Sequence, residues 1–333
     1  MRPLIVFNPR SGRGRAADAA GVLTSALQRA GHQPERYGLP AHTRDPGAYV
    51  FLQEALRRCD LLVVLGGDGT MNSLAGLAAG ADVPVYHVPL GTENLFAREF
   101  GMSRRPEVLL GALEEPNVER VDLASVNDRA FLLMCSVGPD AGTIHRLDRA
   151  RTGSISHLSY VMPAIHEALR PSLRPLTIRV DGTPVVERRC GQVVVANSRQ
   201  YAVRLDPGKH ADMHDGLLDV VFMPATTSAR LVLWGLSSRL RRHTTNRLCV
   251  YEQGSRVSIE SHSDEAPPMQ LDGEAVPGER SLEMTVRPGA LSVLVPPSMR
   301  TARARRSPST RIAWRSARAA SRPDDAALDV ARR

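Results

Sequence analysis

A glycine-rich loop has the composition of a phosphate-binding turn. The segment GGDGT at 66–70 follows the apolar run 61–65 and precedes a helical pattern at 71–79. Glycines allow close backbone approach, so successive amides at the start of a helix can form an anion-binding nest. Thr70 can donate a hydroxyl hydrogen bond, whereas Asp68 would repel a bare phosphate. The Asp68 carboxylate would instead orient a ribose or a phosphate-bound Mg²⁺, or cap the following helix. A plain tight turn is the alternative for the loop alone.

Two further polar loops follow predicted strands. NPRSGRG at 8–14 comes after the strand 3–7, and PLGTEN at 89–94 comes after the strand 83–88. The carboxyl ends of parallel strands meet at one edge of a sheet, where ligands bind. Because Lys209 is the only lysine, the GxxxxGK motif is absent, which excludes a Walker-A kinase. The first loop region adds three arginines that could pair with phosphate or lie on a solvated surface: Arg10, Arg13 and Arg15.

The order and spacing of these loops resemble the diacylglycerol kinase catalytic family. That family includes bacterial lipid kinases and sphingosine kinases, and it is distantly related to NAD kinases. The resemblance covers residues 1–298. The motifs that carry it are NPRSG at 8–12, GGDGT at 66–70, PLGTEN at 89–94, VGPDAG at 137–142, HADMHDGLLDV at 210–220 and LDGE at 271–274.

The resemblance implies an ATP site and an acidic catalytic group. Glu274 corresponds to the family's proton acceptor, which would activate a lipid hydroxyl for attack on the γ-phosphate. Asp68 would lie near the phosphates or a catalytic metal. A hairpin turn at Asp272 with a solvent-facing Glu274 is the alternative. The residues implied to bind ATP are Asn8, Pro9, Arg10, Ser11, Gly12, Thr43, Gly66, Gly67, Asp68, Gly69, Thr70, Met71, Asn72 and Thr92.

The resemblance also implies a structural Mg²⁺ site in the segment 210–220. The Asp215 side chain and the carbonyls of Asp212 and Leu217 would bind the ion. Oxygen ligands suit a hard cation. An Asp-Gly turn at Asp215 without an ion is the alternative. The chain departs from the family pattern at Leu95, where diacylglycerol kinases commonly have an aspartate, and this bears on lipid specificity rather than on the ATP site.

The predicted secondary structure that positions the candidate site residues changes near residue 121. Alternating strands and helices before it predict an α/β N-terminal domain with a doubly wound parallel sheet. Repeated short strands after it predict a mainly β C-terminal domain, most simply a sandwich. The expected domains are an ATP-binding domain at 1–122 and a lipid-substrate domain at 123–298, whose last strand is able to return to the first domain. Residues 299–333 are expected to form a basic, disordered tail.

Charge and composition limit the setting in which the protein works. The chain has 333 residues and a net charge of +8. Ten arginines and three aspartates give 300–333 a charge of 10 − 3 = +7, which leaves +1 for the body. The chain shows no signal peptide and no apolar run long enough to span a bilayer. Four scattered cysteines predict reduced thiols. We therefore expect a cytoplasmic protein that binds the inner, anionic membrane face peripherally through the tail, where Ile312 and Trp314 lie among the arginines.

These observations favour an ATP- and Mg²⁺-dependent lipid kinase. Its first expected substrate is diacylglycerol, which would give phosphatidic acid, although a sphingoid base or phosphatidylglycerol requires the same chemistry. One alternative is a soluble phosphotransferase resembling NAD kinases. Another is a nucleotide-binding regulator without turnover, which the intact Asp68, Asp215 and Glu274 disfavour. No nucleic-acid partner is expected, and the sequence is compatible with a homodimer.

Overall fold

Parallel strands form the centre of the N-terminal half. The computed structural model describes residues 1–40, 46–149 and 161–299, so Thr43 and the tail at 300–333 lie outside the described residues. The strands lie in the spatial order β2–β1–β3–β4, and each pairs in parallel with its neighbour. Their bounds are Pro3–Phe7 for β1, Glu35–Gly38 for β2, Leu61–Gly66 for β3 and Val85–Pro89 for β4.

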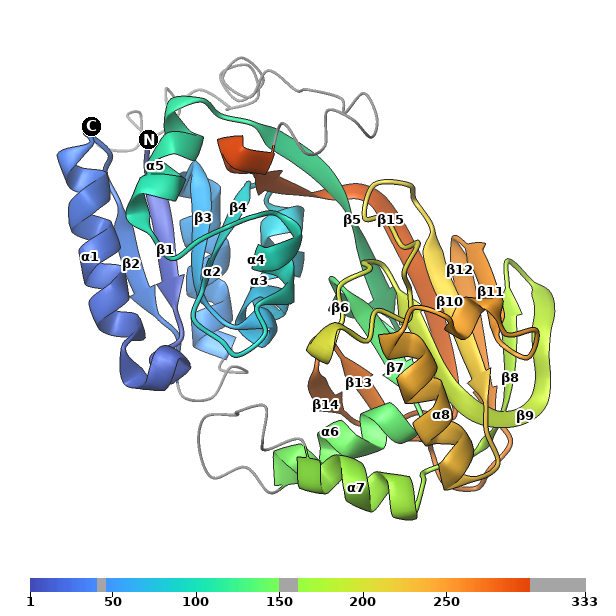
Figure 1. Ribbon diagram of the computed structural model, residues 1–333. Coiled ribbons are helices and arrows are strands. Elements are labelled where there is room, and N and C mark those ends of the chain that lie inside the picture. The colour runs from blue at the N-terminus through green and yellow to red at the C-terminus, as the bar shows by residue number, and fades with distance from the viewer. Residues whose placement is uncertain (41–45, 150–160, 300–333) are drawn as a thin grey trace.

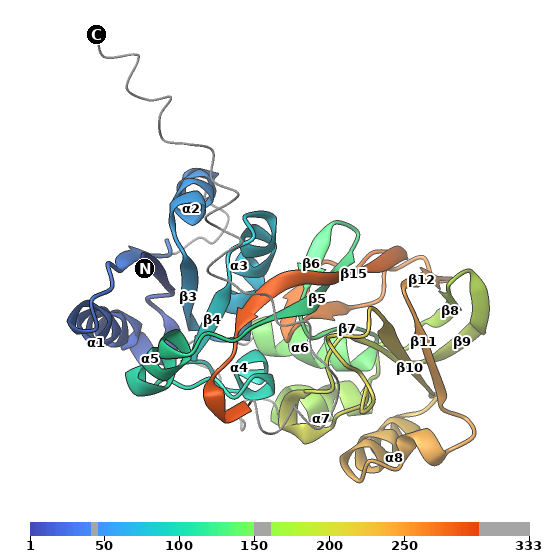
Figure 2. The ribbon, with the colours of Figure 1, turned by 90° about the horizontal axis from the view of Figure 1, so that it is seen from above.

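Helices cover both faces of this parallel sheet. Figure 2 shows α1 and α5 on one face and α2 and α3 on the other. Because β3 is enclosed from both sides, all six of its residues are buried, as expected for a parallel strand. The predicted doubly wound α/β domain is confirmed. The helices are α1 (Ala16–Arg29), α2 (Pro46–Arg58), α3 (Asp68–Gly80), α4 (Leu95–Glu99) and α5 (Pro106–Glu114), with a 3₁₀ turn η1 at Ser11–Gly14.

Two sheets packed face to face form the C-terminal half, which confirms the predicted sandwich. The long strand β9 joins them, since its first part pairs with β8 and its second part pairs with β7 and β10. Apolar side chains from both sheets fill the space between them. One sheet contains β5 (Val118–Val126), β6 (Arg129–Phe131), β8 (Pro175–Val180), β12 (Arg256–Ser261) and β15 (Ser281–Leu294). The other contains β7 (Met134–Val137), β9 (Thr183–Ala196), β10 (Leu218–Pro224), β11 (Val250–Gly254), β13 (Met269–Leu271) and β14 (Glu274–Val276).

A two-stranded ribbon connects the two halves. β5 leaves the N-terminal domain and β15 returns to it, and the two strands pair in antiparallel fashion (Figure 1). Near its end β15 also pairs in parallel with β4, where Val293 lies opposite Val85. The sequence of this region contains two apolar stretches, at 282–286 and 291–295, which read as two of the expected short strands, but β15 runs through both as one strand. An irregularity in register between Arg287 and Leu291, next to Gly289 with φ +59°, explains the break in the apolar pattern.

Three helices lie together beside the second sheet (Figure 1). They are α6 (Pro139–Arg149), α7 (Val161–Leu169) and α8 (Ser228–Arg239). Trp234 of α8 packs against Val221 and Met223 of β10, and its indole N–H donates to the Pro224 carbonyl at 2.8 Å. Helical periodicity in the sequence at 158–169 and 231–240 indicates α7 and α8, whereas no such pattern indicates α6. Among the helices that the structure describes, none is long and apolar enough to cross a membrane. Short 3₁₀ turns occur at Ala202–Arg204 (η3), His243–Thr245 (η4) and Pro297–Met299 (η5).

Candidate active site

Backbone hydrogen bonds tie the three glycine-containing loops together. The Gly12 amide donates to the Leu90 carbonyl at 3.1 Å, and the Leu90 amide donates to the Gly66 carbonyl at 2.8 Å. The Asn8 side-chain amide reaches the Thr70 hydroxyl at 3.4 Å. All three loops follow the carboxyl ends of parallel strands, so the sheet presents them at one edge. The structure thus brings the three motifs into one surface.

Glycine is required where the second and third loops touch. A methyl group placed on Gly91 would lie 2.6 Å from the Gly67 Cα, and one placed on Gly67 would lie 3.3 Å from the Gly91 Cα. Neither residue has a positive φ, so the requirement comes from close backbone approach rather than from backbone strain. Asn94 closes the third loop, since its side chain accepts from the Gly91 amide at 2.7 Å and donates to the Gly91 carbonyl at 2.8 Å.

Asp68 caps a helix, but not the helix that follows it in sequence. Its carboxylate accepts from the amides of Leu95 at 2.9 Å and Phe96 at 3.0 Å, at the start of α4. A carboxylate at a helix N-terminus satisfies amides that lack a partner in the helix and complements the helix dipole. Asp68 therefore fixes the third loop relative to the second. Of the roles considered for Asp68 from the sequence, capping of α3 is not found, because its side chain turns toward α4, the helix after β4.

The other residues predicted to bind ATP differ in how deeply they are buried around the three loops. Met71 is fully buried, and its amide donates to the Gly67 carbonyl, so its side chain contributes to the core beneath the loop. Asn72 faces the C-terminal domain, and with its side-chain amide turned to match its neighbours the nitrogen donates to Asp272 Oδ2 and to the Ala130 carbonyl, both at 3.2 Å. Ser11 and Gly12 are half-buried in the first loop. Exposed on the loops are Pro9, Arg10 and Thr92.

Glu274 of the C-terminal domain lies against the glycine-rich loop of the N-terminal domain. A methyl group placed on Gly69 would overlap the Glu274 carboxylate. The turn between β13 and β14 presents this side chain, because Asp272 and Gly273 have φ of 50° and 86°. Two successive residues with positive φ are the requirement of a type I′ hairpin. A hairpin turn at Asp272 and a catalytic role for Glu274 are thus compatible, because the turn itself positions the Glu274 carboxylate next to the glycine-rich loop.

The neighbouring Asp272 holds this hairpin in place. Its buried carboxylate accepts from the backbone amides of Leu132, Leu133 and Met134 at 2.7, 2.8 and 2.9 Å. Burial raises the pKa of Asp272 to about 7, although the hydrogen bonds from the three backbone amides partly oppose this by lowering the pKa. Because Asn72 in this orientation donates to the same carboxylate, α3 and the β13–β14 hairpin share one anchor.

An apolar cavity of about 260 Å³ opens beside the hairpin, among α6, α8, β9 and β10. The Asp140 carboxylate lies in its wall and accepts from the hydroxyls of Tyr201 at 2.5 Å and Ser136 at 2.6 Å. Burial and the adjacent Asp140 raise the pKa of Tyr201 well above its usual value. The apolar part of the lining includes Val194, Leu205, Met223, Leu231, Val232 and Trp234. In the sequence only the VGPDAG motif at 137–142, which contains Pro139 and Asp140, indicated this part of the molecule.

Helix α4 connects the glycine-containing loops to this cavity. The Arg98 guanidinium donates to Gln200 Oε1 at 2.7 Å and to the Tyr201 carbonyl at 3.2 Å. Gln200 in turn donates to Glu99 at 2.8 Å. Since Asp68 caps α4 and Tyr201 contacts the cavity carboxylate, a continuous series of contacts links the two parts of the site.

The segment predicted to bind a metal ion forms a compact turn. Asp215 Oδ1 accepts from the Leu217 amide at 3.0 Å, and the Asp215 amide donates to the Asp212 carbonyl at 3.4 Å. Burial raises the pKa of Asp215, and nearby aspartates add to the shift. Within residues 1–40, 46–149 and 161–299, no three His, Cys, Asp or Glu side chains gather as a metal cluster. The donors here are one carboxylate and backbone carbonyls, an oxygen-only set that fits a hard cation.

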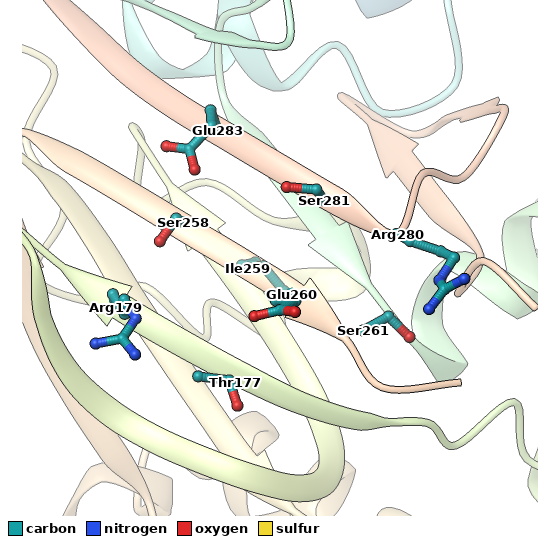
Figure 3. A pocket seen from close by; sticks show the side chains of 9 residues that line it. All are labelled: Thr177, Arg179, Ser258, Ile259, Glu260, Ser261, Arg280, Ser281 and Glu283. Carbon is teal, nitrogen blue, oxygen red and sulfur yellow. The ribbon is translucent and has the colours of Figure 1, made fainter. Parts of the chain in front are cut away.

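A second hollow, of about 560 Å³, lies on the outer face of the sheet that contains β8, β12 and β15 (Figure 3). Arg179 of β8, Glu260 of β12 and Glu283 of β15 line it, together with serine and threonine side chains. These neighbouring strands place acidic and basic groups side by side, which is typical of a solvated sheet face. None of its lining residues belongs to the glycine loops or to the β13–β14 hairpin.

Comparison with known families divides the chain as the fold does. Residues 2–126 match the family model of the diacylglycerol kinase catalytic domain. Residues 134–295 match the model of the YegS C-terminal NAD kinase beta sandwich-like domain. A diacylglycerol kinase of Mycobacterium tuberculosis is 27% identical over 286 residues, which cover 81% of this chain and 91% of the relative. A probable lipid kinase, YegS-like, of Pseudomonas fluorescens is 29% identical over 252 residues, which cover 71% of this chain and 77% of the relative.

A solved structure shows the same fold. The crystal structure of a diacylglycerol kinase from Bacillus anthracis superposes with a TM-score of 0.64 at 18% sequence identity. The superposition covers 89% of this chain and 97% of that chain. Both domains and the ribbon between them therefore belong to one shared architecture.

Proposed function

Because the chain is a lipid kinase of the diacylglycerol kinase family, with the two domains found in it, we propose that its acceptor is diacylglycerol and its product phosphatidic acid. The kinase family implies ATP as the co-substrate. The name of the Mycobacterium tuberculosis relative and its coverage of both domains support this choice of acceptor. The contact between Glu274 and Gly69 carries the proposal, since it places a carboxylate of one domain beside the candidate phosphate-binding loop of the other.

The two domains have different roles in this proposal. The amides of the 66–70 loop, at the start of α3, bind the phosphates of ATP. Glu274 accepts the proton of the acceptor hydroxyl as the oxygen attacks the γ-phosphate. Asp68 fixes the geometry of the loops through α4, a role that its hydrogen bonds to the Leu95 and Phe96 amides support. Positioning is the main contribution of a protein to phosphoryl transfer, so the rigid connection between loop and hairpin is part of the mechanism.

The apolar cavity is where we place the lipid. Its wall is apolar along α8 and β10, which suits an acyl chain, and it carries Asp140 at the side of α6. The Asp140 carboxylate already accepts from the hydroxyls of Tyr201 and Ser136 and from the Gln270 amide of β13, and a glycerol hydroxyl is a fourth group that its two oxygens can bind. The lipid would then lie with its polar end toward the hairpin that carries Glu274.

A magnesium ion suits the oxygen donors of the Asp215 turn. We propose that the Asp215 carboxylate and the carbonyls of Asp212 and Leu217 hold it, as the donor set allows. A bound ion would join the Asp215 carboxylate to the two backbone carbonyls and so stabilise the turn. The Asp215 turn itself has a structural role, because Asp122 on β5 accepts from the amides of Gly216 at 2.7 Å and Gly289 at 2.8 Å and so ties the turn to the ribbon.

A transfer assay with radiolabelled ATP tests the function directly. Diacylglycerol, a sphingoid base, phosphatidylglycerol and NAD are offered separately, and we expect label in phosphatidic acid. Label in NAD would instead identify a soluble-substrate phosphotransferase, and no transfer to any acceptor would indicate a regulator. Glu274→Gln should lower kcat by about 10²–10⁴-fold with ATP binding retained. Glu252→Gln, on the exposed part of β11, is the matched control and should leave kcat unchanged.

A further inference from the structure

Large apolar side chains are exposed on two neighbouring helices. Of the eleven such side chains among the described residues, eight lie on α7, on α8 or in the segment that follows α8. On α7, Met162, Ile165 and Leu169 are 71%, 48% and 74% exposed. On α8 and its C-cap, Val232, Leu233, Leu236 and Leu240 are between 52% and 63% exposed. These seven side chains are called the α7–α8 face below. An apolar patch of this kind marks an interaction surface.

Both helices expose a row of large apolar side chains, although α8 also buries Trp234 against β10. Helix α7 exposes positions spaced by three and four residues, yet it buries Glu167, which pairs with Arg146 at 2.9 Å. Helix α8 exposes Leu236 and Leu240 and buries Ser238. A helix that only packs on a core buries its apolar stripe and exposes its polar one. Folding alone therefore does not explain this arrangement, and the face fits an apolar partner.

The charges around the face indicate what that partner is. Arginines flank the apolar side chains at Arg170, Arg239, Arg242 and Arg247, all of them exposed. The segment 226–248 contains no Asp or Glu. Two copies of the chain meeting through this face would bring like charges together, whereas the headgroups of an anionic leaflet are complementary to them. The combination of an apolar stripe and flanking arginines is that of a helix that lies in a membrane interface.

The apolar cavity continues into the same face. Leu231, Val232 and Trp234 of α8 line the cavity, and Val232 also belongs to the exposed face. A lipid acceptor resides in a bilayer, so an enzyme that acts on it must meet both the bilayer and the acceptor. We propose that the α7–α8 face docks on the surface of an anionic membrane and sets the cavity opening against the leaflet. The role given to the cavity rests on the proposed function, whereas the docking itself rests on the exposed side chains and their charges.

Sedimentation with vesicles tests the docking without any chemistry. The full chain is mixed with vesicles of equal parts phosphatidylcholine and phosphatidylserine, without nucleotide. The double variant Leu233→Glu/Leu236→Glu changes two exposed positions that do not line the cavity. We expect its vesicle affinity to fall at least about tenfold. The matched control Val22→Glu/Val50→Glu changes exposed apolar side chains on α1 and α2 and should bind like the unchanged chain. Thermal melting of each variant verifies that it is folded.

Three outcomes would overturn the docking proposal. The first is equal vesicle binding by the folded Leu233→Glu/Leu236→Glu variant. The second is complete loss of binding on deletion of 300–333 while that variant still binds, which would assign docking to the tail. The third is a dimer of the unchanged chain that the variant dissociates in sedimentation velocity, which would identify a second copy as the occupant.

An activity measurement separates this proposal from the proposed function. On a water-dispersed, short-chain diacylglycerol, the Leu233→Glu/Leu236→Glu variant should retain the turnover of the unchanged chain. On the same anionic vesicles containing long-chain diacylglycerol, its turnover should fall in parallel with binding. If the unchanged chain phosphorylates neither lipid yet needs this face to bind vesicles, the proposed function fails and the docking stands. If the variant is equally active on both substrates and binds vesicles normally, the docking fails and the proposed function stands.

Discussion

Gly69→Ala is expected to separate catalysis from folding. Gly69 lies in the first turn of α3 at a φ that alanine can adopt, so the substitution should leave stability unchanged or raise it by up to about 1 kcal/mol. The new methyl group, however, overlaps the Glu274 carboxylate. To reach an ordinary contact of about 3.5 Å, the carboxylate must retreat by roughly 1.5 Å or more. A misplacement of about 1 Å can cost about 10²-fold in rate, so we expect kcat to fall by at least that factor, which is about 2.7 kcal/mol in the activation barrier.

The assay must show that the loss passes through Glu274. kcat is measured with saturating ATP and detergent-dispersed diacylglycerol, ATP affinity by calorimetry and stability by thermal melting. Gly76→Ala, in the same helix, is the control, because its methyl group meets only Ala130 at 4.0 Å. In a double-mutant cycle, Gly69→Ala should add almost nothing to Glu274→Gln. A kcat near that of the unchanged chain for Gly69→Ala, or full additivity in the cycle, would refute the role given to this contact.

Two further substitutions test the contact between Gly67 and Gly91 and the proposed ion in the Asp215 turn. Gly91→Ala should force the second and third loops apart, lower the free energy of unfolding by about 1–3 kcal/mol and weaken ATP binding in calorimetry. The control Gly80→Ala should be tolerated, because its methyl group meets nothing within 4 Å. An unchanged ATP affinity for Gly91→Ala would contradict the requirement for close approach. Asp215→Ala should abolish any rise in melting temperature on adding Mg²⁺, because an ion bound to the native state stabilises that state. The control Asp264→Ala, at an exposed position, should retain the rise. An equal rise in both variants would place the ion elsewhere.

Local patterns were sufficient to predict the fold class and the convergence of the loops. The run 61–65 is apolar throughout because β3 is enclosed on both faces, and its period and length indicated a buried parallel strand. The glycines after it marked the carboxyl edge of the sheet. Strand-loop-helix order alone then required the loops at 8–14, 66–70 and 89–94 to lie together, and their mutual hydrogen bonds show that they do.

Contacts between distant residues could not be predicted in this way. Asp68 caps α4, 27 residues further along the chain, and no spacing rule connects the two. Asp140 and Tyr201 are 61 residues apart, and their hydrogen bond depends on how α6 and the loop after β9 pack on the sheet. The irregular register in β15 made one strand look like two. In each case tertiary packing, rather than local propensity, determines the arrangement.

The return of β15 to the parallel sheet affects the order in which the protein can be made. Leu291, Val293 and Leu294 are buried in the core of the N-terminal domain, although about 200 residues separate Val293 from its partner Val85. At a synthesis rate of about 5–20 residues per second, roughly 10–40 s pass before the ribosome releases the strand that completes this core. During that interval β4 is an open sheet edge, which is a template for pairing with other nascent chains. The domain that emerges first is therefore among the last to be finished, and a chaperone that shields the β4 edge would act on this protein while it is still being translated.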